Sequence, residues 1–419
     1  MLLGKTKEGL RYVVRKRASS SVAYCALTIG GGTRAEEGLY PEGTAHFVEH
    51  TLFKGTSSKR SSAINAYLDR LGGELNAFTT KEEIVLHSTV LKRDLRKAAD
   101  LLMELALDPV FPQREIDCER GVIMDEIQSY KDVPSDDVYD RFESMFFQGH
   151  PLSRMILGTS RSLKSITRED LLSYNRRYFR YENMVLSLVA AMEEKELEKC
   201  VCRLSSQWAE RVPSATEPVP IEASSSFATE SYQPCVPFEK HISKRNHQIN
   251  CVYGGPAPTL ADKEKRIAAI LLCNVLGGPS SNSILNACLR EKNGWVYGVE
   301  CNYTPYADAG LMNISFGCEK ENADKCLSVI RREMAKLREK EWTQARLSRA
   351  CRQLLGQIAI SADSGEAQAI SAGKSMLVFN TVKSDEENKK ALLALTPAFL
   401  KEVAAELFDE SKMSLLMYE

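Results

Sequence analysis

The 419-residue sequence lacks any apolar run long enough to span a bilayer, and it carries almost no net charge. Its 55 Lys and Arg residues nearly balance 56 Asp and Glu residues, which leaves a formal charge of -1 at pH 7. A surface without excess positive charge has no electrostatic reason to bind nucleic acid or anionic lipid. We therefore expect neither nucleic acid nor a membrane as a partner.

The sequence also lacks a CxxC pair, although it contains 12 cysteines. The closest two are Cys200 and Cys202, and the others are scattered. The segment from Met1 to Arg17 contains no uninterrupted apolar core of the kind found in secretory signals. Scattered cysteines without such a signal are typical of reduced thiols. We expect a cytoplasmic protein without a disulfide framework or a thiolate zinc site.

Proline and serine are concentrated in one segment of the chain. Five of the 15 prolines and three consecutive serines fall between Arg211 and Lys240. This density disfavours both helix and sheet interior. It predicts a linker at residues 213–237, which joins a first domain at 1–212 to a second domain at 238–419.

The two halves show the same order of predicted elements. Each begins with an apolar strand that ends in glycines, and a loop, two helices, an antiparallel strand pair and charged amphipathic helices follow. This order predicts an α+β fold with two duplicated domains, each a mostly antiparallel sheet packed with helices. Two unrelated α+β domains are the alternative. The strands are expected at Val22–Ile29, Leu75–Thr80, Ile84–Leu91, Ile249–Tyr253, Val296–Tyr303 and Gly310–Phe316, and helices from Thr44 and at Asp94–Leu107, Leu260–Val275 and Ala323–Glu341.

Two of the six histidines lie four residues apart, in the sequence His46-Phe47-Val48-Glu49-His50. Positions i and i+4 of a helix share one face, so both imidazoles are able to reach one metal ion. Glu49 lies on that face as well. Burying three such polar groups costs free energy unless they have binding partners, which a metal ion would supply. The spacing is the inverted zincin motif. The alternative is a pair of core or surface histidines with a helical salt bridge.

A catalytic zinc ion takes three protein ligands and keeps one position open for water. Candidates for the third ligand lie between Cys118 and Glu126, where Glu119 and Glu126 are seven residues apart and share a helix face. Either carboxylate is able to bind the metal while the other supports it. Asp125 points about 100° away from Glu126 and is the weaker candidate.

These motifs, in this order, resemble the pitrilysin group of metallopeptidases, which includes insulin-degrading enzyme and the mitochondrial processing peptidase. The resemblance implies Zn²⁺ as the cofactor, with His46, His50 and Glu126 as ligands, Glu49 as the general base and Glu119 as a supporting carboxylate. Glu126 lies 126 − 50 = 76 positions after His50, as the family pattern requires. Further matching segments are Leu52-Phe53-Lys54-Gly55-Thr56, Gly72-Gly73-Glu74-Leu75-Asn76-Ala77-Phe78-Thr79, His150-Pro151-Leu152 with Ile156-Leu157-Gly158-Thr159, and Leu289-Arg290-Glu291-Lys292-Asn293-Gly294-Trp295-Val296-Tyr297.

The resemblance also implies a function and an architecture. The two domains would form half of a clamshell, and the chain would be a zinc-dependent endopeptidase that hydrolyses unfolded peptides inside a chamber of paired subunits. Substrate would add as a strand to a sheet edge formed by Asn76, Ala77, Phe78 and Thr79. A non-catalytic structural subunit of the same fold is the alternative.

The second half is expected to contribute Arg290 and Tyr297, which the resemblance makes the pair that stabilises the tetrahedral intermediate. Family members often carry arginine at two nearby positions where this chain has Ile284 and Asn293. Because the metal motif and the Arg/Tyr pair lie on one chain, the resemblance favours a homodimer. The remaining histidines (His87, His150, His241 and His247) are expected to be structural or exposed.

Overall fold

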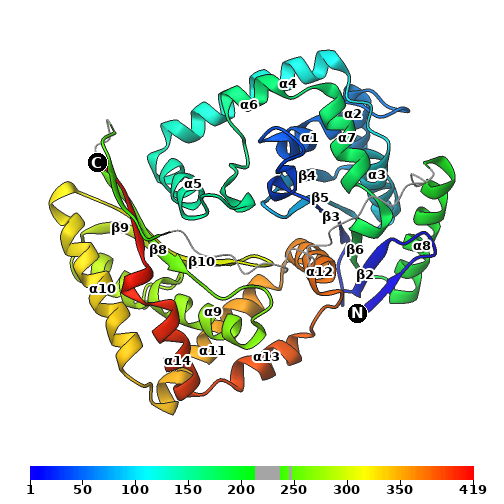
Figure 1. Cartoon of the computed structure of the whole chain (residues 1–419). Helices are drawn as coiled ribbons and strands as arrows, with labels where there is room; N and C mark the ends of the chain where they lie inside the picture. Colours follow the sequence, from blue (N-terminus) through cyan, green and yellow to red (C-terminus); the bar gives the residue numbers. More distant parts are fainter. Residues whose placement is uncertain (213–235, 245–247) are drawn as a thin grey trace. The chain divides into compact units, whose positions relative to one another are not determined.

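The computed structural model describes residues 1–212, 236–244 and 248–419 (Figure 1). The chain divides into two compact units, and each unit is built on one sheet. The first unit takes its described residues from the ranges Met1–Ile127, Arg154–Ser226 and Ile360–Val382. The second takes its described residues from Gln128–Ser153, Phe227–Ala359 and Lys383–Glu419.

The first unit contains a six-stranded sheet in the order β1-β2-β6-β3-β5-β4. Neighbouring strands are antiparallel, except that β2 and β6 are parallel. The central strand β3 is apolar and buried along most of its length because helices cover both faces of the sheet. The strands are β1 (Leu2–Lys5), β2 (Arg11–Lys16), β3 (Val22–Gly30), β4 (Glu74–Thr79), β5 (Glu83–Leu91) and β6 (Met184–Ala190).

The second unit contains a five-stranded sheet in the order β7-β11-β8-β10-β9. This order repeats that of the first sheet from β2 to β4, and its one parallel pair, β7 and β11, corresponds to β2 and β6. The predicted fold class, two duplicated α+β domains with mostly antiparallel sheets, is therefore confirmed. The strands are β7 (Glu239–Ile242), β8 (Ile249–Pro256), β9 (Val296–Pro305), β10 (Gly310–Cys318) and β11 (Ser414–Tyr418).

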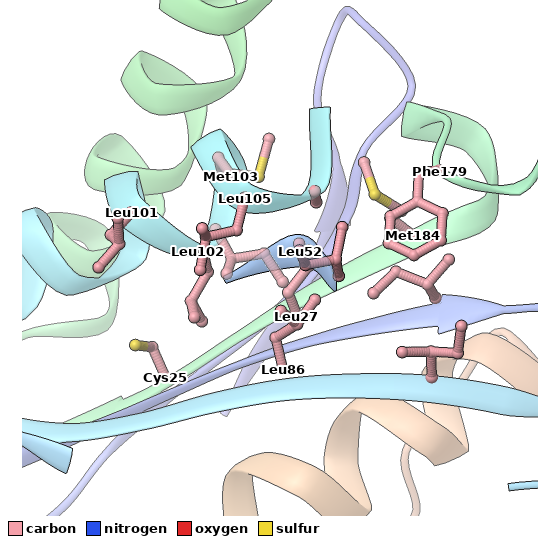
Figure 2. Close-up of a cluster of buried hydrophobic side chains, with 14 of the residues drawn as sticks. Cys25, Leu27, Leu52, Leu86, Leu101, Leu102, Met103, Leu105, Phe179 and Met184 are labelled. Atoms are coloured by element: carbon pink, nitrogen blue, oxygen red, sulfur yellow. The ribbon is translucent and has the colours of Figure 1, made fainter. Parts of the chain in front are cut away.

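A core of leucine side chains joins the first sheet to the helices on one of its faces (Figure 2). Leu27 of β3 and Leu86 of β5 pack with Leu52 of α1 and Leu102 of α3, and all four are fully buried. Each buried leucine contributes about 1.5–3 kcal/mol. Packing therefore holds the nine-residue α1 in place, since so short a helix is not stable alone. The helices of this unit are α1 (Thr44–Leu52), α2 (Ser61–Leu71), α3 (Leu95–Leu107), most of α4 (Gln113–Asp132), α6 (Ser160–Ser165), α7 (Arg168–Tyr178), α8 (Glu194–Arg211) and α12 (Gly365–Phe379).

The helices of the second unit pack on its sheet around a separate core. None of the helices in the described part of the chain is long and apolar enough to cross a membrane. The helices of this unit are α5 (Pro134–Phe146), α9 (Lys263–Gly277), α10 (Ala323–Glu339), most of α11 (Gln344–Ser361), α13 (Asp385–Leu393) and α14 (Pro397–Leu407), together with a π-helical turn, η6 (Asn286–Glu291).

The two halves of the sequence exchange one helix each. Helix α5, from the first half, packs against β8 and β11 of the second sheet, whereas α12, from the second half, packs against β3 and β6 of the first sheet. The compact units therefore differ from the domains expected at 1–212 and 238–419 by these two segments. As a division of the sequence into duplicated parts, those boundaries remain a prediction. Of the expected linker at 213–237, only residues 236 and 237 are among the described residues.

Candidate metal centre

Helix α1 is held at its N-terminus by a carboxyl group from outside the helix. Gly43 precedes the helix with a φ of 90°, a left-handed conformation that glycine adopts without strain. The fully buried Glu36 accepts hydrogen bonds from the backbone N–H of Gly43 at 3.0 Å and of Ala45 at 2.7 Å. N–H groups at a helix N-terminus lack partners within the helix, and the Glu36 oxygens accept hydrogen bonds from two N–H groups there. Glu36 thus fixes the start of the helix that carries His46.

The structure brings His46, His50 and Glu126 together, with one ligand atom of each within 4.8 Å of the others. The His46 and His50 rings lie one helical turn apart, with centroids separated by 4.6 Å. Glu126 reaches them from α4, which places its Oε2 atom 3.8 Å from His46 Nε2 and 3.5 Å from His50 Nε2. Among the described residues, this is the one group of three His, Cys, Asp or Glu side chains with such spacing.

The donor set fits a tetrahedral zinc ion. Zinc bonds of about 2.0–2.2 Å place neighbouring ligand atoms about 3.3–3.6 Å apart, close to the separations between Glu126 Oε2 and the two imidazoles. The other ring nitrogen of His46, Nδ1, is buried and has no hydrogen-bond partner among the described residues. The distances from Nε2 to Glu49 and Glu126 show that Nε2 is the nitrogen of His46 that faces the other donors. Two imidazoles and one carboxylate form the ligand set of a catalytic site with one open position.

The protonation states of these groups depend on their surroundings. Burial, together with the charge of His50, lowers the pKa of His46 to about 4 against the opposing charge of Glu126, which keeps this imidazole neutral. The hydrogen bond to His50 lowers the pKa of Glu126 and keeps it a carboxylate. Burial lowers the pKa of His50, but hydrogen bonds to Glu126 and Glu119 outweigh burial, and the net direction is upward.

Glu119 connects His50 to a lysine that was not predicted as a site residue. Its Oε2 atom lies 3.1 Å from His50 Nδ1, and its Oε1 atom lies 2.7 Å from Nζ of Lys54. A carboxylate on the second nitrogen of a ligand histidine fixes the ring orientation and raises its basicity. Lys54 lies four residues after His50, and this helical spacing could have indicated from the sequence that the two side chains are close. However, its partner on α4 is 65 positions away in the sequence (119 − 54 = 65).

Glu49 is buried beside the two histidines, with its Oε2 atom 4.0 Å from His46 Nε2. The hydroxyl of Thr79 donates a hydrogen bond of 3.1 Å to the same oxygen. Burial raises the pKa of Glu49, against the opposing effects of His50 and of this hydrogen bond. A carboxyl with a raised pKa is a stronger base when ionised, which suits a group that accepts a proton from water.

The expected substrate strand is β4, which lies at the edge of the first sheet and pairs only with β5 in that sheet. Asn76 is exposed, Ala77 and Phe78 are half-buried, and Thr79 is buried. An edge strand with unpaired backbone groups is able to accept an added strand. The structure therefore places all four residues where strand addition is feasible, and their role in substrate binding remains a prediction.

Arg290 and Tyr297 lie in the second unit and contact each other. The Arg290 guanidinium is 5.7 Å from the centre of the Tyr297 ring, and Tyr297 is 90% exposed. Arg290 belongs to the π-helical turn η6, a conformation that is frequent at functional sites. The two departures from the family pattern have local structural roles. Ile284 packs against the core of the second unit, and Asn293 donates a hydrogen bond to the Cys288 carbonyl.

Comparison with known families identifies both halves of the chain. The family model described as insulinase (peptidase family M16) matches residues 11–160, and the model described as peptidase M16 inactive domain matches residues 165–354. The chain belongs to peptidase family M16. The segment matched by the insulinase model includes His46, His50 and Glu126. The described part of the second half holds no comparable ligand group.

Relatives of this M16 protein are named as zinc proteases. An uncharacterised zinc protease of Rickettsia bellii is 27% identical over 89% of this chain and 87% of its own length. The uncharacterised zinc protease YmxG of Bacillus subtilis is 27% identical over 96% of this chain and 95% of its own length. These matches support a zinc metallopeptidase at the level of the family.

Solved structures confirm the M16 fold. A protease from Helicobacter pylori superposes with a TM-score of 0.88 at 19% identity, and covers 100% of this chain and 99% of its own. A Pseudomonas fluorescens structure described as a peptidase M16 inactive domain superposes with a TM-score of 0.87 at 20% identity. The match covers 100% of this chain and 97% of the other chain. At these identities the likeness establishes the architecture alone.

Proposed function

We propose that this M16 protein is a zinc-dependent endopeptidase that hydrolyses unfolded peptides. The observation that carries the proposal is the convergence of His46, His50 and Glu126, with Glu49 buried beside them. Zinc, when bound there, supplies a Lewis acid and lowers the pKa of a bound water. Within this donor set, two neutral imidazoles and one carboxylate leave a net positive centre that favours this chemistry.

The residues of the chain then have separate roles in the proposed reaction. Glu49 accepts the proton of the attacking water and delivers it to the leaving amine, while Thr79 holds its carboxylate in position. The open edge of β4 pairs with the peptide backbone, which makes recognition tolerant of sequence. Arg290 and Tyr297 donate to the oxyanion of the tetrahedral intermediate. We further propose that two copies of the chain pair to form the reaction chamber, in a reducing cytoplasm suited to the free cysteines among the described residues.

A cavity in the second unit suggests which peptides are preferred. Its volume is about 800 Å³, and it is bordered by α5 and by strands β8, β9 and β10. Asp136, Asp140 and Glu300 line it together with Tyr139 and Tyr297, and no Lys or Arg is among the described residues of its wall. Acidic and aromatic groups together favour a cation. We propose that this cavity takes an arginine or lysine side chain of the substrate.

The alternative function is a structural subunit without catalysis. All three candidate ligands and the candidate base are present and close together, which favours the enzyme. The test is cleavage of an unstructured quenched peptide by wild type and by Glu49→Gln, with zinc measured in both. We expect equal zinc content and a loss of activity of about 10²–10⁴-fold in the variant. Zinc binding without cleavage in the wild type would establish the structural subunit instead.

A further inference from the structure

Helix α12 is part of the first unit although it follows strands β7 to β10 and helices α9 to α11 of the second half in the sequence. Figure 1 shows it in orange against the strands of the first sheet, and Figure 2 shows its pale orange ribbon on the face opposite the leucine core. Gly365, Ala369 and Gly373 recur every four residues along it. A Cβ atom at Gly365 would collide with the Tyr24 ring, and one at Gly373 with the Thr28 hydroxyl. The helix therefore lies at the closest approach that the sheet allows.

Two charged side chains of α12 extend to the β4–β5 hairpin. Glu366 Oε1 lies 2.8 Å from Nδ1 of His87 on β5. Lys374 Nζ lies 2.5 Å from a carboxylate oxygen of Glu83 and 5.2 Å from the centre of the Phe78 ring. The rings of Phe78 and His87 are 6.0 Å apart, so the two charged contacts meet at one pair of aromatic side chains. Phe78 also belongs to the group of side chains packed around Ala369 of α12.

The opposite face of β4 carries the contacts to the candidate metal centre. Successive side chains of a strand point to opposite faces, so Phe78 faces α12 while Ala77 and Thr79 face the other way. Ala77 packs against the core that includes Leu52 of α1. Thr79 donates its hydrogen bond to Glu49 of the same helix. The strand is thus held between the helix that carries the metal motif and a helix supplied by the second half.

Strand β4 needs this support because it is an edge strand. It has backbone hydrogen bonds to β5 on one side only, and its other side must stay open for a peptide to add. An unsupported edge strand loses conformational freedom when it binds, and this loss weakens binding. The contacts of α12 are made by side chains on the sheet face, so they stiffen the strand without occupying its open edge.

We propose that Glu366 and Lys374 are positioning residues, which hold β4 ready to receive the peptide and keep Thr79 aligned on Glu49. The inference rests on the proposed peptidase function and deepens it. It assigns to the second half a role inside the first unit that is distinct from the role of Arg290 and Tyr297. Neither Glu366 nor Lys374 is placed among the groups that touch the reacting atoms.

The test is a set of full-length variants assayed with one unstructured peptide. Lys374→Met keeps the length of the side chain but removes its charge, and Glu366→Gln removes the carboxylate that faces His87. Lys374→Arg is the conservative rescue variant. Lys389→Met is the matched control, since Lys389 makes a similar ion pair with Glu386 on the exposed helix α13. Lys374→Met combined with Glu83→Gln avoids leaving Glu83 without its partner. KM, kcat and zinc content are measured for each variant. The Kd of the peptide is measured after each change is combined with Glu49→Gln, so that the peptide binds without being cleaved.

We expect KM and Kd to rise about three- to tenfold in Lys374→Met and in the double variant, with zinc content unchanged. Lys374→Arg should restore both values, and Lys389→Met should leave both unchanged. Unaltered KM and Kd in folded, zinc-loaded variants would overturn the positioning role while the peptidase function stands. A wild type that binds zinc but neither binds nor cleaves the peptide would overturn the proposed function, and this inference with it.

Discussion

At the scale of single residues, two side chains of the candidate centre, His50 and Glu49, have a second contact that fixes their direction. His50 is held by Glu119, Glu119 by Lys54, and Glu49 by Thr79. A hydrogen bond to a charged group contributes about 1.5–3 kcal/mol, enough to select one orientation of a ring or carboxylate. The centre is therefore preorganised by residues that do not reach the metal position themselves.

This arrangement predicts different outcomes for the two glutamates of α4. Glu126→Gln removes the anionic ligand, so zinc affinity should fall by more than the change caused by Glu119→Gln. A loss of the supporting carboxylate typically costs about 10–100-fold in affinity or activity. Competition with a zinc-binding dye measures both affinities. Asp125→Asn is the control, because this carboxylate is exposed on the same helix. A larger loss in Glu119→Gln would make Glu119 the ligand.

At the scale of elements, local pattern was sufficient to predict helix α1 and strand β4 beside the candidate centre, whereas strands β1, β2, β6, β7 and β11 were not predicted. An apolar run that ends in glycines predicted a strand at Val22–Ile29, and β3 spans Val22–Gly30. The i, i+4 spacing predicted the metal helix, which begins at Thr44 as expected. Contacts between residues that are distant in the sequence leave no such local pattern. Glu126 was chosen over Glu119 by family resemblance alone, and no periodicity in α12 reveals that it packs on the first sheet.

The anchor of α1 predicts a pH dependence of stability. Burial raises the pKa of Glu36 to about 8, despite the opposing hydrogen bond from Ala45 and the charge of Arg154. The ordinary value is 4.5, so between these values the folded protein binds more protons than the unfolded chain. The free energy of unfolding should therefore decrease as pH rises from about 4.5 to about 8. Glu36→Gln keeps an acceptor oxygen but removes this titration.

Chemical denaturation at several pH values in this window measures the effect. The stability of wild type relative to Glu36→Gln should decrease by more than about 1.4 kcal/mol from the acidic to the basic end. Glu37→Gln, at the exposed neighbouring position, should follow the wild type throughout. If the curves of wild type and Glu36→Gln were parallel, Glu36 would be ionised over the whole range.

The acidic cavity beside α5 predicts a substrate preference. The combined change Asp136→Asn and Asp140→Asn should raise KM about tenfold for a peptide that contains arginine, since two charge-assisted contacts weaken. KM for the same peptide with norleucine in place of arginine should stay unchanged. Asp132→Asn is the control, because Asp132 precedes α5 and is not among the residues that line the cavity. Equal effects on both peptides would mean that the cavity does not distinguish a charged substrate side chain from an uncharged one.

At the scale of the whole molecule, the chain crosses between its two units repeatedly. The helices exchanged between the halves, α5 and α12, lie in the unit built mainly from the other half. A cut at the linker would leave each sheet without the helix that covers part of one face. The halves are therefore not separable modules, and one chain holds both the metal motif and the Arg/Tyr pair. If two copies pair, each copy would supply both a metal motif and an Arg/Tyr pair.

This combination predicts complementation between two defective variants. In a C2 dimer whose sites each combine the metal centre of one copy with Arg290 and Tyr297 of the other, Glu49→Gln and Tyr297→Phe damage different components. A mixed dimer then contains one site with both defects and one site with none. Random exchange makes about half of the dimers mixed, so about one quarter of wild-type activity should return. Steady-state cleavage by the mixture, compared with each variant alone, measures this recovery.

The experiment needs proof that subunits exchange, because absence of exchange would also give no recovery. Two affinity tags, one on each variant, allow mixed dimers to be purified through both and assayed directly. Purified mixed dimers should show about half of the wild-type activity, since one of their two sites is intact. If the purified mixed dimers are no more active than Tyr297→Phe, then Arg290 and Tyr297 either serve the metal centre of their own chain or take no part in the reaction. A chain that remains monomeric while it cleaves peptides would contradict the paired chamber itself.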